Sequence, residues 1–317
     1  VRFYAFQPDP TPRMLDRPIC IIGAARSGTT VLGHLLAHHP AVAYWEEPKY
    51  VWRYRKPTAP HDVRTAAEAT PAVRHYIRSE LSQHVVEHDA DRLLEKTPSN
   101  CFRVPFVYAV LPNIRIVHLV RDGRDVAFSA RQQWLRLNDG KADPTEATGA
   151  SVDGYDRIWQ PVWERLQALE VPLVDLPFYA AQYLQKLTMT AFGKERPYVW
   201  GPKFPDIREV AEAQNVLEVC AVQWAKSVQA ARNGLRSVPD DQQLEVRFET
   251  LVQAPTTTLR RILDFAKISM DPTLIERAEE TLRADAAHRW KKRDEDEIKR
   301  IMNEVGRFVK KIDSEYR

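Results

Sequence analysis

The chain has 317 residues, of which 44% are hydrophobic and 28% are charged. These proportions are ordinary for a globular protein, and they exclude a collagen-like chain, a disordered tail protein and a disulfide-stapled small protein. The 46 Lys and Arg residues exceed the 43 Asp and Glu residues by a formal net charge of only +3. Such a small excess suits an anionic small ligand, whereas a nucleic-acid partner usually needs a clustered basic face.

The cysteine content and the hydropathy exclude further classes. Cys20, Cys101 and Cys220 are too few and too scattered to predict a disulfide framework or a zinc site. No window approaches the ~20 apolar residues of a membrane span, so we expect no integral membrane segment in this chain. The chain begins with Val1, and its first residues lack the apolar core of a secretion signal.

Five short runs, rich in apolar and β-branched residues, are predicted to form strands. They are residues 18–22, 41–45, 92–96, 115–120 and 244–248. Helical patterns separate the runs, and this alternation predicts an α/β fold with a mainly parallel sheet and helices on both faces. His118 lies inside the fourth run, and we expect it to be a satisfied core residue rather than a catalytic base.

The second half of the chain is more helical. Apolar residues recur at steps of three or four from Leu217 to Leu235, and again from Ile298 to Ile312. This spacing is typical of helices with one buried face. Asp294 precedes the second pattern and is predicted to cap that helix, and the acidic residues after it suit the positive end of the helix dipole.

The stretch from about 138 to 205 does not follow the alternation of strands and helices. It combines a polar part with an aromatic-rich part in which acidic and basic residues balance. We interpret it as an elaboration near the functional site, on a single domain that spans residues 1–317. A neutral aromatic surface suits a sugar, a phenol or a lipid-like molecule.

The strongest local motif lies between the first predicted strand and the helix after it. Its residues are Gly23, Ala24, Ala25, Arg26, Ser27, Gly28, Thr29 and Thr30. Glycines permit tight turns, and the amides at a helix start form a cradle for an anion together with the helix dipole. The spacing matches a nucleotide-binding phosphate loop except that Thr29 replaces the lysine, which argues against hydrolysis of ATP or GTP. A strand–turn–helix without a ligand is the structural alternative.

A second motif follows the strand predicted at 115–120. Arg121 leaves the carboxyl end of that strand, Gly123 turns the chain, and a helix that carries Ser129 is predicted to start near Asp125. A guanidinium and a hydroxyl placed in this way can converge on one phosphate. Ligands of open α/β sheets bind at the carboxyl ends of the strands. A surface cluster of ion pairs is the alternative explanation.

Together the two motifs resemble those of the sulfotransferases that use 3′-phosphoadenosine 5′-phosphosulfate, a family similar in fold to the P-loop kinases. The Arg-Ser-Gly-Thr form of the loop is similar to that of Golgi carbohydrate, tyrosylprotein and many bacterial members. The resemblance is sharp over residues 18–131 and weaker beyond. It implies that the first motif binds the 5′-phosphosulfate and that the second binds the 3′-phosphate. The implied donor-binding residues are Arg26, Ser27, Gly28, Thr29, Thr30, Arg121 and Ser129.

Sulfuryl transfer to an alcohol needs a base, cations that offset charge on the bridging oxygen, and an in-line arrangement. By resemblance to the tyrosylprotein group, Glu47 is the general base, with Glu46 as its neighbour or alternate. The resemblance also implies that Lys96 stabilises the transferring sulfuryl group together with Arg26. A solvated acidic pair and a surface lysine are the structural alternatives. We find no carboxylate cluster that demands a metal, and we expect none to be required.

The resemblance thus predicts a sulfotransferase that moves a sulfuryl group from 3′-phosphoadenosine 5′-phosphosulfate to a hydroxyl of a carbohydrate, a phenol or tyrosine, or a lipid-like acceptor. A P-loop small-molecule kinase and a non-catalytic nucleotide- or glycan-binding protein are the alternatives. We expect no nucleic-acid partner and a cytoplasmic location, or the Golgi lumen if an N-terminal anchor was removed. The basic run from Arg289 to Arg293 either is a solvated face or closes over the nucleotide, as in the family. The sequence specifies neither the acceptor, nor the residue that stacks on adenine, nor the oligomeric state.

Overall fold

The protein is described by a computed structural model over residues 15–138 and 199–315. Five strands form one parallel sheet in the order β2-β3-β1-β4-β5. The strands are β1 (Ile19–Ile22), β2 (Val42–Glu46), β3 (Arg92–Lys96), β4 (Arg115–Val120) and β5 (Gln243–Arg247). Each lies within one residue of its predicted bounds, so the predicted α/β fold with a parallel sheet is confirmed.

The central strand β1 is buried on both faces of the sheet. Ile19 and Ile21 belong to one hydrophobic core, whereas Cys20 and Ile22 belong to the core on the opposite face. Burying one isoleucine side chain contributes roughly 1.5–3 kcal/mol. A strand that has a core on each face needs apolar residues at every position, which explains why this run has no polar alternation.

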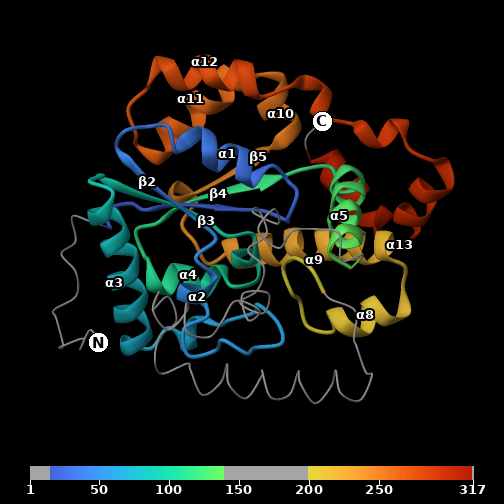
Figure 1. The fold of residues 1–317 in the computed structure, drawn as a ribbon, viewed down its shortest axis with the longest axis horizontal. Coiled ribbons are helices and arrows are strands. Elements are labelled where there is room, and N and C mark those ends of the chain that lie inside the picture. Colours follow the sequence, from blue (N-terminus) through green and yellow to red (C-terminus); the bar gives the residue numbers. More distant parts are fainter. Residues whose placement is uncertain (1–14, 139–198, 316–317) are drawn as a thin grey trace.

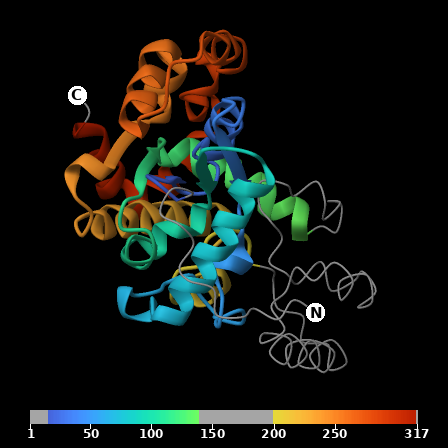
Figure 2. The same cartoon turned by 90° about the vertical axis from the view of Figure 1, so that its left-hand side faces the viewer.

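Helices cover both faces of the sheet, as Figures 1 and 2 show from two directions. One face carries α1 (Thr29–Leu36), α10 (Phe248–Gln253), α11 (Pro255–Ala266) and α12 (Pro272–Thr281). The other face carries α2 (Lys49–Trp52), α3 (Pro71–Glu87), α4 (Val104–Val110) and α9 (Val216–Leu235). The predicted covering of both faces is therefore confirmed.

A third hydrophobic core lies beside the sheet, where several helices pack on α9. These helices are α5 (Gly123–Asn138), α8 (Ile207–Ala213) and α13 (Glu295–Ser314). The two predicted amphipathic patterns form α9 and α13. Asp294 caps α13 as expected: its carboxylate accepts hydrogen bonds from the amides of Asp296 and Glu297, both at 3.0 Å. Short 3₁₀ turns complete the described chain: η1 (Ala66–Glu68), η2 (Pro98–Phe102), η5 (Asp240–Gln242), η6 (Ala284–Ala286) and η7 (Arg289–Lys292).

The start of α5 and the segment 138–205 are the predicted features of the middle of the chain. Helix α5 begins at Gly123, two residues before the predicted start at Asp125. The reason is that Asp122 acts as the cap, since its carboxylate accepts a hydrogen bond of 2.9 Å from the amide of Arg124. The predicted elaboration at 138–205 lies outside the described residues except for its two ends.

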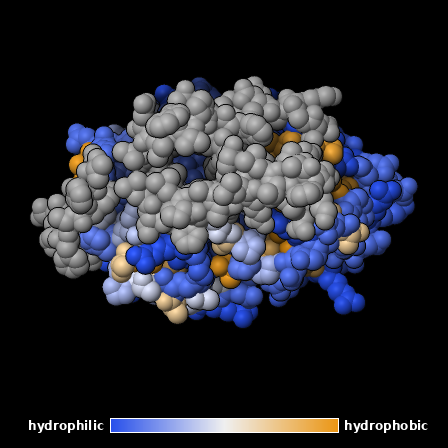
Figure 3. All heavy atoms as spheres, turned by 60° about the horizontal axis from the view of Figure 1, so that its bottom comes forward, coloured by the Kyte–Doolittle hydropathy of each residue, from blue (hydrophilic) through white to orange (hydrophobic). Residues whose placement is uncertain are grey.

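The surface of the described residues is mostly hydrophilic. Figure 3 shows one face, on which hydrophobic residues form small separate spots among hydrophilic ones. The large hydrophobic side chains that are exposed in the described parts are Val31, Val86, Leu135 and Met270. Single exposed apolar residues of this kind are normal. No helix in the described ranges is both long enough and apolar enough to span a membrane.

A polar contact inside the sheet joins β4, β5 and α9. His118 is buried completely, and its Nδ1 lies 2.9 Å from Oε2 of Glu245, its register partner on β5. Glu245 also accepts a hydrogen bond of 2.7 Å from Arg232. Burial alone raises the pKa of Glu245, but the bonds from His118 and Arg232 outweigh burial and lower this pKa to about 2. His118 is thus a partnered core residue at Nδ1, while its Nε2 has no partner among the described residues.

This contact predicts a pH-dependent contribution to stability. A carboxyl whose pKa is lowered by folding stabilises the protein above its unfolded pKa of about 4.3, and the contribution disappears as the pH falls toward the folded value. We expect Glu245→Gln to lower the free energy of unfolding at pH 7 by on the order of 2 kcal/mol. The difference from wild type should shrink between pH 5 and pH 3 in denaturant titrations. Glu280→Gln, at an exposed position of α12, is the control, and an unchanged difference across this pH range would contradict the assignment.

Candidate active site

The predicted site residues lie at the carboxyl ends of four neighbouring strands. Gly23 follows β1, Glu47 follows β2, Lys96 ends β3 and Arg121 follows β4. Because the strands are parallel, their carboxyl ends share one edge of the sheet, where open α/β sheets bind ligands. The structure therefore brings both motifs and the acidic pair to the same edge, although they are far apart in the sequence.

The first motif has the backbone of an anion-binding loop. Arg26 and Gly28 both have positive φ angles, 72° and 94°, and α1 begins directly after Gly28. Left-handed residues next to a helix start turn successive amides toward one point, which favours an anion there. Ser27 is buried completely, and its hydroxyl has no hydrogen-bond partner within the described ranges. A cradle lined by an unpartnered hydroxyl fits a phosphate or a sulfate group.

The second motif contacts the first through two arginines. Arg26 donates a hydrogen bond from Nε to Oγ of Ser129 at 3.1 Å, and Arg121 donates one to the carbonyl oxygen of Arg26 at 3.2 Å. The guanidinium of Arg121 also lies over the ring of Phe248, 4.4 Å from its centroid. Burial and then the charge of Arg121 lower the pKa of Arg26. Nη2 of Arg121 also lies 3.6 Å from Asp125, so its charge is partly compensated within the protein. Both arginines nevertheless place guanidinium groups at this edge, which favours an anion there.

A segment near the C-terminus lies against the second motif. The amide of Trp290 donates a hydrogen bond of 2.7 Å to Asp125, and the guanidinium of Arg124 lies 3.8 Å from the centroid of the Trp290 ring. Arg121 donates a hydrogen bond of 2.7 Å to the carbonyl oxygen of Ala286. The basic run that the sequence left unassigned is thus anchored beside the proposed 3′-phosphate residues. The family resemblance offered closure of this run over the nucleotide as one alternative, but the individual contacts, which join segments about 165 residues apart, could not be predicted from the local sequence pattern.

The acidic pair and the lysine form a second group of site residues. Nζ of Lys96 lies 2.7 Å from Oε1 of Glu46, 2.8 Å from Oε1 of Glu47 and 3.0 Å from Oγ1 of Thr30. The amide of Glu47 donates a hydrogen bond of 2.8 Å to the carbonyl oxygen of Lys96, at a backbone φ of 51°. The two elements β2 and β3 are therefore joined at their ends by both main chain and side chains.

The two carboxylates of this group differ in environment. The Glu47 side chain is 2% exposed and its Oε2 lies 3.4 Å from Nζ of Lys49, whereas the Glu46 side chain is 28% exposed. Burial alone raises the pKa of Glu46, but Lys96 and then His34 outweigh burial and lower it below its usual value. Lys96 is thus buried rather than on the surface, and Glu47 is shielded from solvent, while Glu46 is partly exposed.

Arg26 and Lys96, which are predicted to act together on one sulfuryl group, contact different partners in the structure. Arg26 contacts the second motif, whereas Lys96 contacts the acidic pair. Thr30, predicted as a donor ligand, contacts Lys96 as well. Sequence reasoning missed His34, although its position one helical turn after Thr30 placed it on the same face of α1.

The aromatic residues around the acidic pair pack against the hydrophobic cores, but only Trp52 is buried; Tyr44, Trp45, Tyr50 and Tyr54 are partly buried. Trp52 is buried and donates a hydrogen bond of 2.9 Å to Glu95, and Trp45 stacks on His84 with 4.3 Å between ring centroids. Trp200 is buried as well. These contacts contribute to the fold and leave the acceptor surface unassigned. Within residues 15–138 and 199–315, no cluster of three or more His, Cys, Asp or Glu residues could hold a metal ion.

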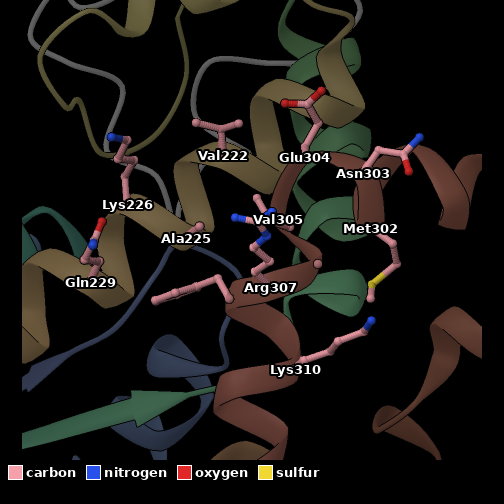
Figure 4. Close-up of a pocket in the computed structure, with 12 residues that line it drawn as sticks. Val222, Ala225, Lys226, Gln229, Met302, Asn303, Glu304, Val305, Arg307 and Lys310 are labelled. Atoms are coloured by element: carbon pink, nitrogen blue, oxygen red, sulfur yellow. The ribbon is translucent and has the colours of Figure 1, made fainter.

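A groove elsewhere on the molecule is not part of this site. Figure 4 shows residues of α9 and α13 that line it. Its volume is about 770 Å³. The groove is lined by the charged residues Lys226, Arg307 and Lys310 and by the apolar residues Val222 and Phe308, among others. None of the predicted site residues lines the groove, and it holds no buried charged group that would mark a binding site. We therefore place the candidate active site at the strand ends.

The geometry of the loop predicts the effect of adding one methyl group. A Cβ at Gly28 would lie 2.5 Å from the Phe248 ring, and φ there is 94°, so we expect Gly28→Ala to lower the free energy of unfolding by about 1–3 kcal/mol. Gly306→Ala is the control inside α13, where the nearest atom is the flexible end of Met302 at 3.3 Å. Its stability should stay unchanged or rise by up to about 1 kcal/mol. Denaturant titration measures both, and equal stability of the two variants would contradict the proposed constraint.

Comparison with known proteins identifies the family. The model of the sulfotransferase family matches residues 18–185 and 200–272. An uncharacterized protein of Aquifex aeolicus (strain VF5) is 28% identical over an aligned stretch of 138 residues. The match covers 39% of this chain and 18% of that protein. The chain thus matches less than a fifth of the length of this relative.

Two sulfotransferase domains are among the solved structures that match this chain. The one from the curacin biosynthetic pathway is 16% identical, with a TM-score of 0.50 over 92% of this chain and 98% of that domain. The one from the Synechococcus PCC 7002 olefin synthase is 15% identical, with a TM-score of 0.49 over 93% of this chain and 97% of that domain. Because the family model matches well over half of the residues, the chain belongs to the sulfotransferase family.

Proposed function

We propose that this sulfotransferase transfers a sulfuryl group from 3′-phosphoadenosine 5′-phosphosulfate to a hydroxyl of an acceptor. The observation that carries the proposal is the direct contact between the two anion-binding motifs through Arg26. Its side chain donates a hydrogen bond to Ser129, and its carbonyl oxygen accepts one from Arg121. The proposed donor carries negative charge at both its 3′ and its 5′ end. Two linked cationic sites suit such a molecule better than a nucleotide with a single phosphate chain.

The described residues fit this donor chemically. The loop from Ser27 to Thr30 would hold the 5′ end through its amides and hydroxyls. Arg121 and Ser129 would hold the 3′-phosphate. The Ser27 hydroxyl and Nε of Arg121 are both buried without a hydrogen-bond partner among the described residues, so each is available to a ligand. Bound there, the donor supplies an activated sulfuryl group.

The chain itself supplies the base and the cations. Glu47 takes the proton of the acceptor hydroxyl while the hydroxyl oxygen forms its bond to sulfur. The bond between sulfur and the 5′-phosphate oxygen breaks, and its electron pair stays on that oxygen. Arg26 and Lys96 offset the negative charge that develops on the sulfuryl and phosphate oxygens. The products are a sulfate ester, adenosine 3′,5′-bisphosphate and a proton on Glu47.

The base assignment predicts a selective loss of turnover. General-base catalysis contributes about 10²–10⁴ in rate, so we expect Glu47→Gln to lower kcat by at least about 100-fold. The amide has nearly the shape of the carboxylate, so the Kd for adenosine 3′,5′-bisphosphate should stay within about twofold of wild type. Transfer from labelled donor to an acceptor panel measures the rate, and the exposed Glu280→Gln is the control. Equal turnover in Glu47→Gln and wild type removes this base assignment.

The same assays separate the alternative functions. A thermal shift with ATP and Mg²⁺ but none with adenosine 3′,5′-bisphosphate would favour a kinase. Binding of the bisphosphate without any transfer over the whole acceptor panel would favour a binding protein.

The 3′-phosphate assignment predicts a ligand-dependent effect of one hydroxyl. Ser129→Ala should weaken binding of adenosine 3′,5′-bisphosphate by about 5- to 20-fold, because a hydrogen bond to a charged group contributes about 1.5–3 kcal/mol and part of that is recovered by water. Binding of adenosine 5′-monophosphate, which has no 3′-phosphate, should not change. Isothermal titration of both ligands measures the difference. Equal weakening of both ligands would place Ser129 elsewhere in the site.

A further inference from the structure

His34 connects the candidate base group to the solvent. It lies on α1 one turn after Thr30, and its Nε2 is 3.0 Å from Oε2 of Glu46. Its side chain is 58% exposed, whereas Glu46 is 28% exposed and Lys96 is buried completely. The ring lies edge-on to Tyr44, with 5.6 Å between centroids. Neither the phosphate loop nor the acceptor chemistry described above uses this imidazole.

The contacts continue without a break into the buried group. The second oxygen of Glu46, Oε1, lies 2.7 Å from Nζ of Lys96, which lies 2.8 Å from Glu47. Lys96 thus has three partners for its three N–H groups: Thr30 and the two carboxylates. The position of the ammonium depends on all three partners, since loss of one would leave a buried donor unpaired.

We propose that His34 is a positioning residue that acts through Glu46 to hold the ammonium of Lys96 against Glu47. This inference rests on the proposed function for its effect on turnover, but the contact itself can be tested without it. His34 holds one oxygen of Glu46, so the other oxygen stays on Lys96. Without His34, the half-buried Glu46 side chain is free to turn toward water and to release the lysine.

Three variants separate positioning from a general structural effect. His34→Gln keeps an N–H donor for Glu46, and His34→Ala removes the donor. His38→Ala is the control one turn further along the chain, because His38 is also exposed and its side chain bonds to the main-chain carbonyl oxygen of His34 rather than to Glu46. Substitutions at exposed positions usually change stability by less than about 0.5 kcal/mol, so all three variants should fold.

The direct readout is the ¹⁵N resonance of the Lys96 ammonium, measured by NMR at pH 8. In His34→Ala we expect the resonance to shift from its wild-type position, and in His34→Gln and His38→Ala we expect it to stay there. An unchanged resonance in His34→Ala would overturn the proposal. This measurement needs no substrate, so it gives an answer even if the protein transfers no sulfuryl group.

The kinetic readout tests the consequence for turnover. Small displacements of catalytic groups reduce rates strongly, so we expect His34→Ala to lower kcat about tenfold at pH 8 and to leave both KM values unchanged. His34→Gln should recover kcat to within about twofold of wild type at this pH. If His34→Ala has the kcat of wild type, or if Gln fails to restore the loss, the proposed positioning role is wrong. A wild-type protein without transfer activity would overturn the proposed function while leaving the NMR result to decide the contact.

Discussion

The buried ammonium of Lys96 is the interaction on which the candidate base group depends. A charge that is removed completely from water costs several kcal/mol unless it is paired and hydrogen-bonded. Here Thr30, Glu46 and Glu47 supply the three partners, and they come from α1 and from the end of β2. The need to satisfy this one cation therefore fixes the ends of two strands and the start of a helix relative to one another. It also explains why Glu47 lies almost entirely out of solvent at a left-handed backbone position.

The parallel sheet brings this group next to the anion-binding motifs. All five strands run in the same direction, so the turns that leave them meet at one edge. Close packing then determines the shape of these turns: the ring of Phe248 lies against Gly28, and the ring of Trp224 lies against Gly123. The indole of Trp224 also donates a hydrogen bond of 3.0 Å to the carbonyl oxygen of Arg121. Helix α9 thus holds the second motif through Trp224, and Phe248, which follows β5, packs against the first.

Much of this architecture could be predicted from local sequence patterns, because the strands and capped helices depend on neighbouring residues. The apolar runs predicted all five strands, and Asp294 predicted the start of α13. The contacts between Arg26 and Ser129 and between His34 and Glu46 could not be predicted in this way. They depend on side-chain directions that only the packed sheet determines. Helix α5 begins at Gly123, two residues before the predicted Asp125, because Asp122 caps the helix.

The central claim is that one adenosine bisphosphate binds across both motifs. A crystal structure of the protein with adenosine 3′,5′-bisphosphate tests it most directly. The account predicts the 5′-phosphate against the amides from Ser27 to Thr30, and the 3′-phosphate within hydrogen-bond distance of Arg121 and Ser129. A complex in which the ribose 3′ side points away from Arg121 and Ser129, or in which the loop after Gly23 contacts no phosphate, would contradict it.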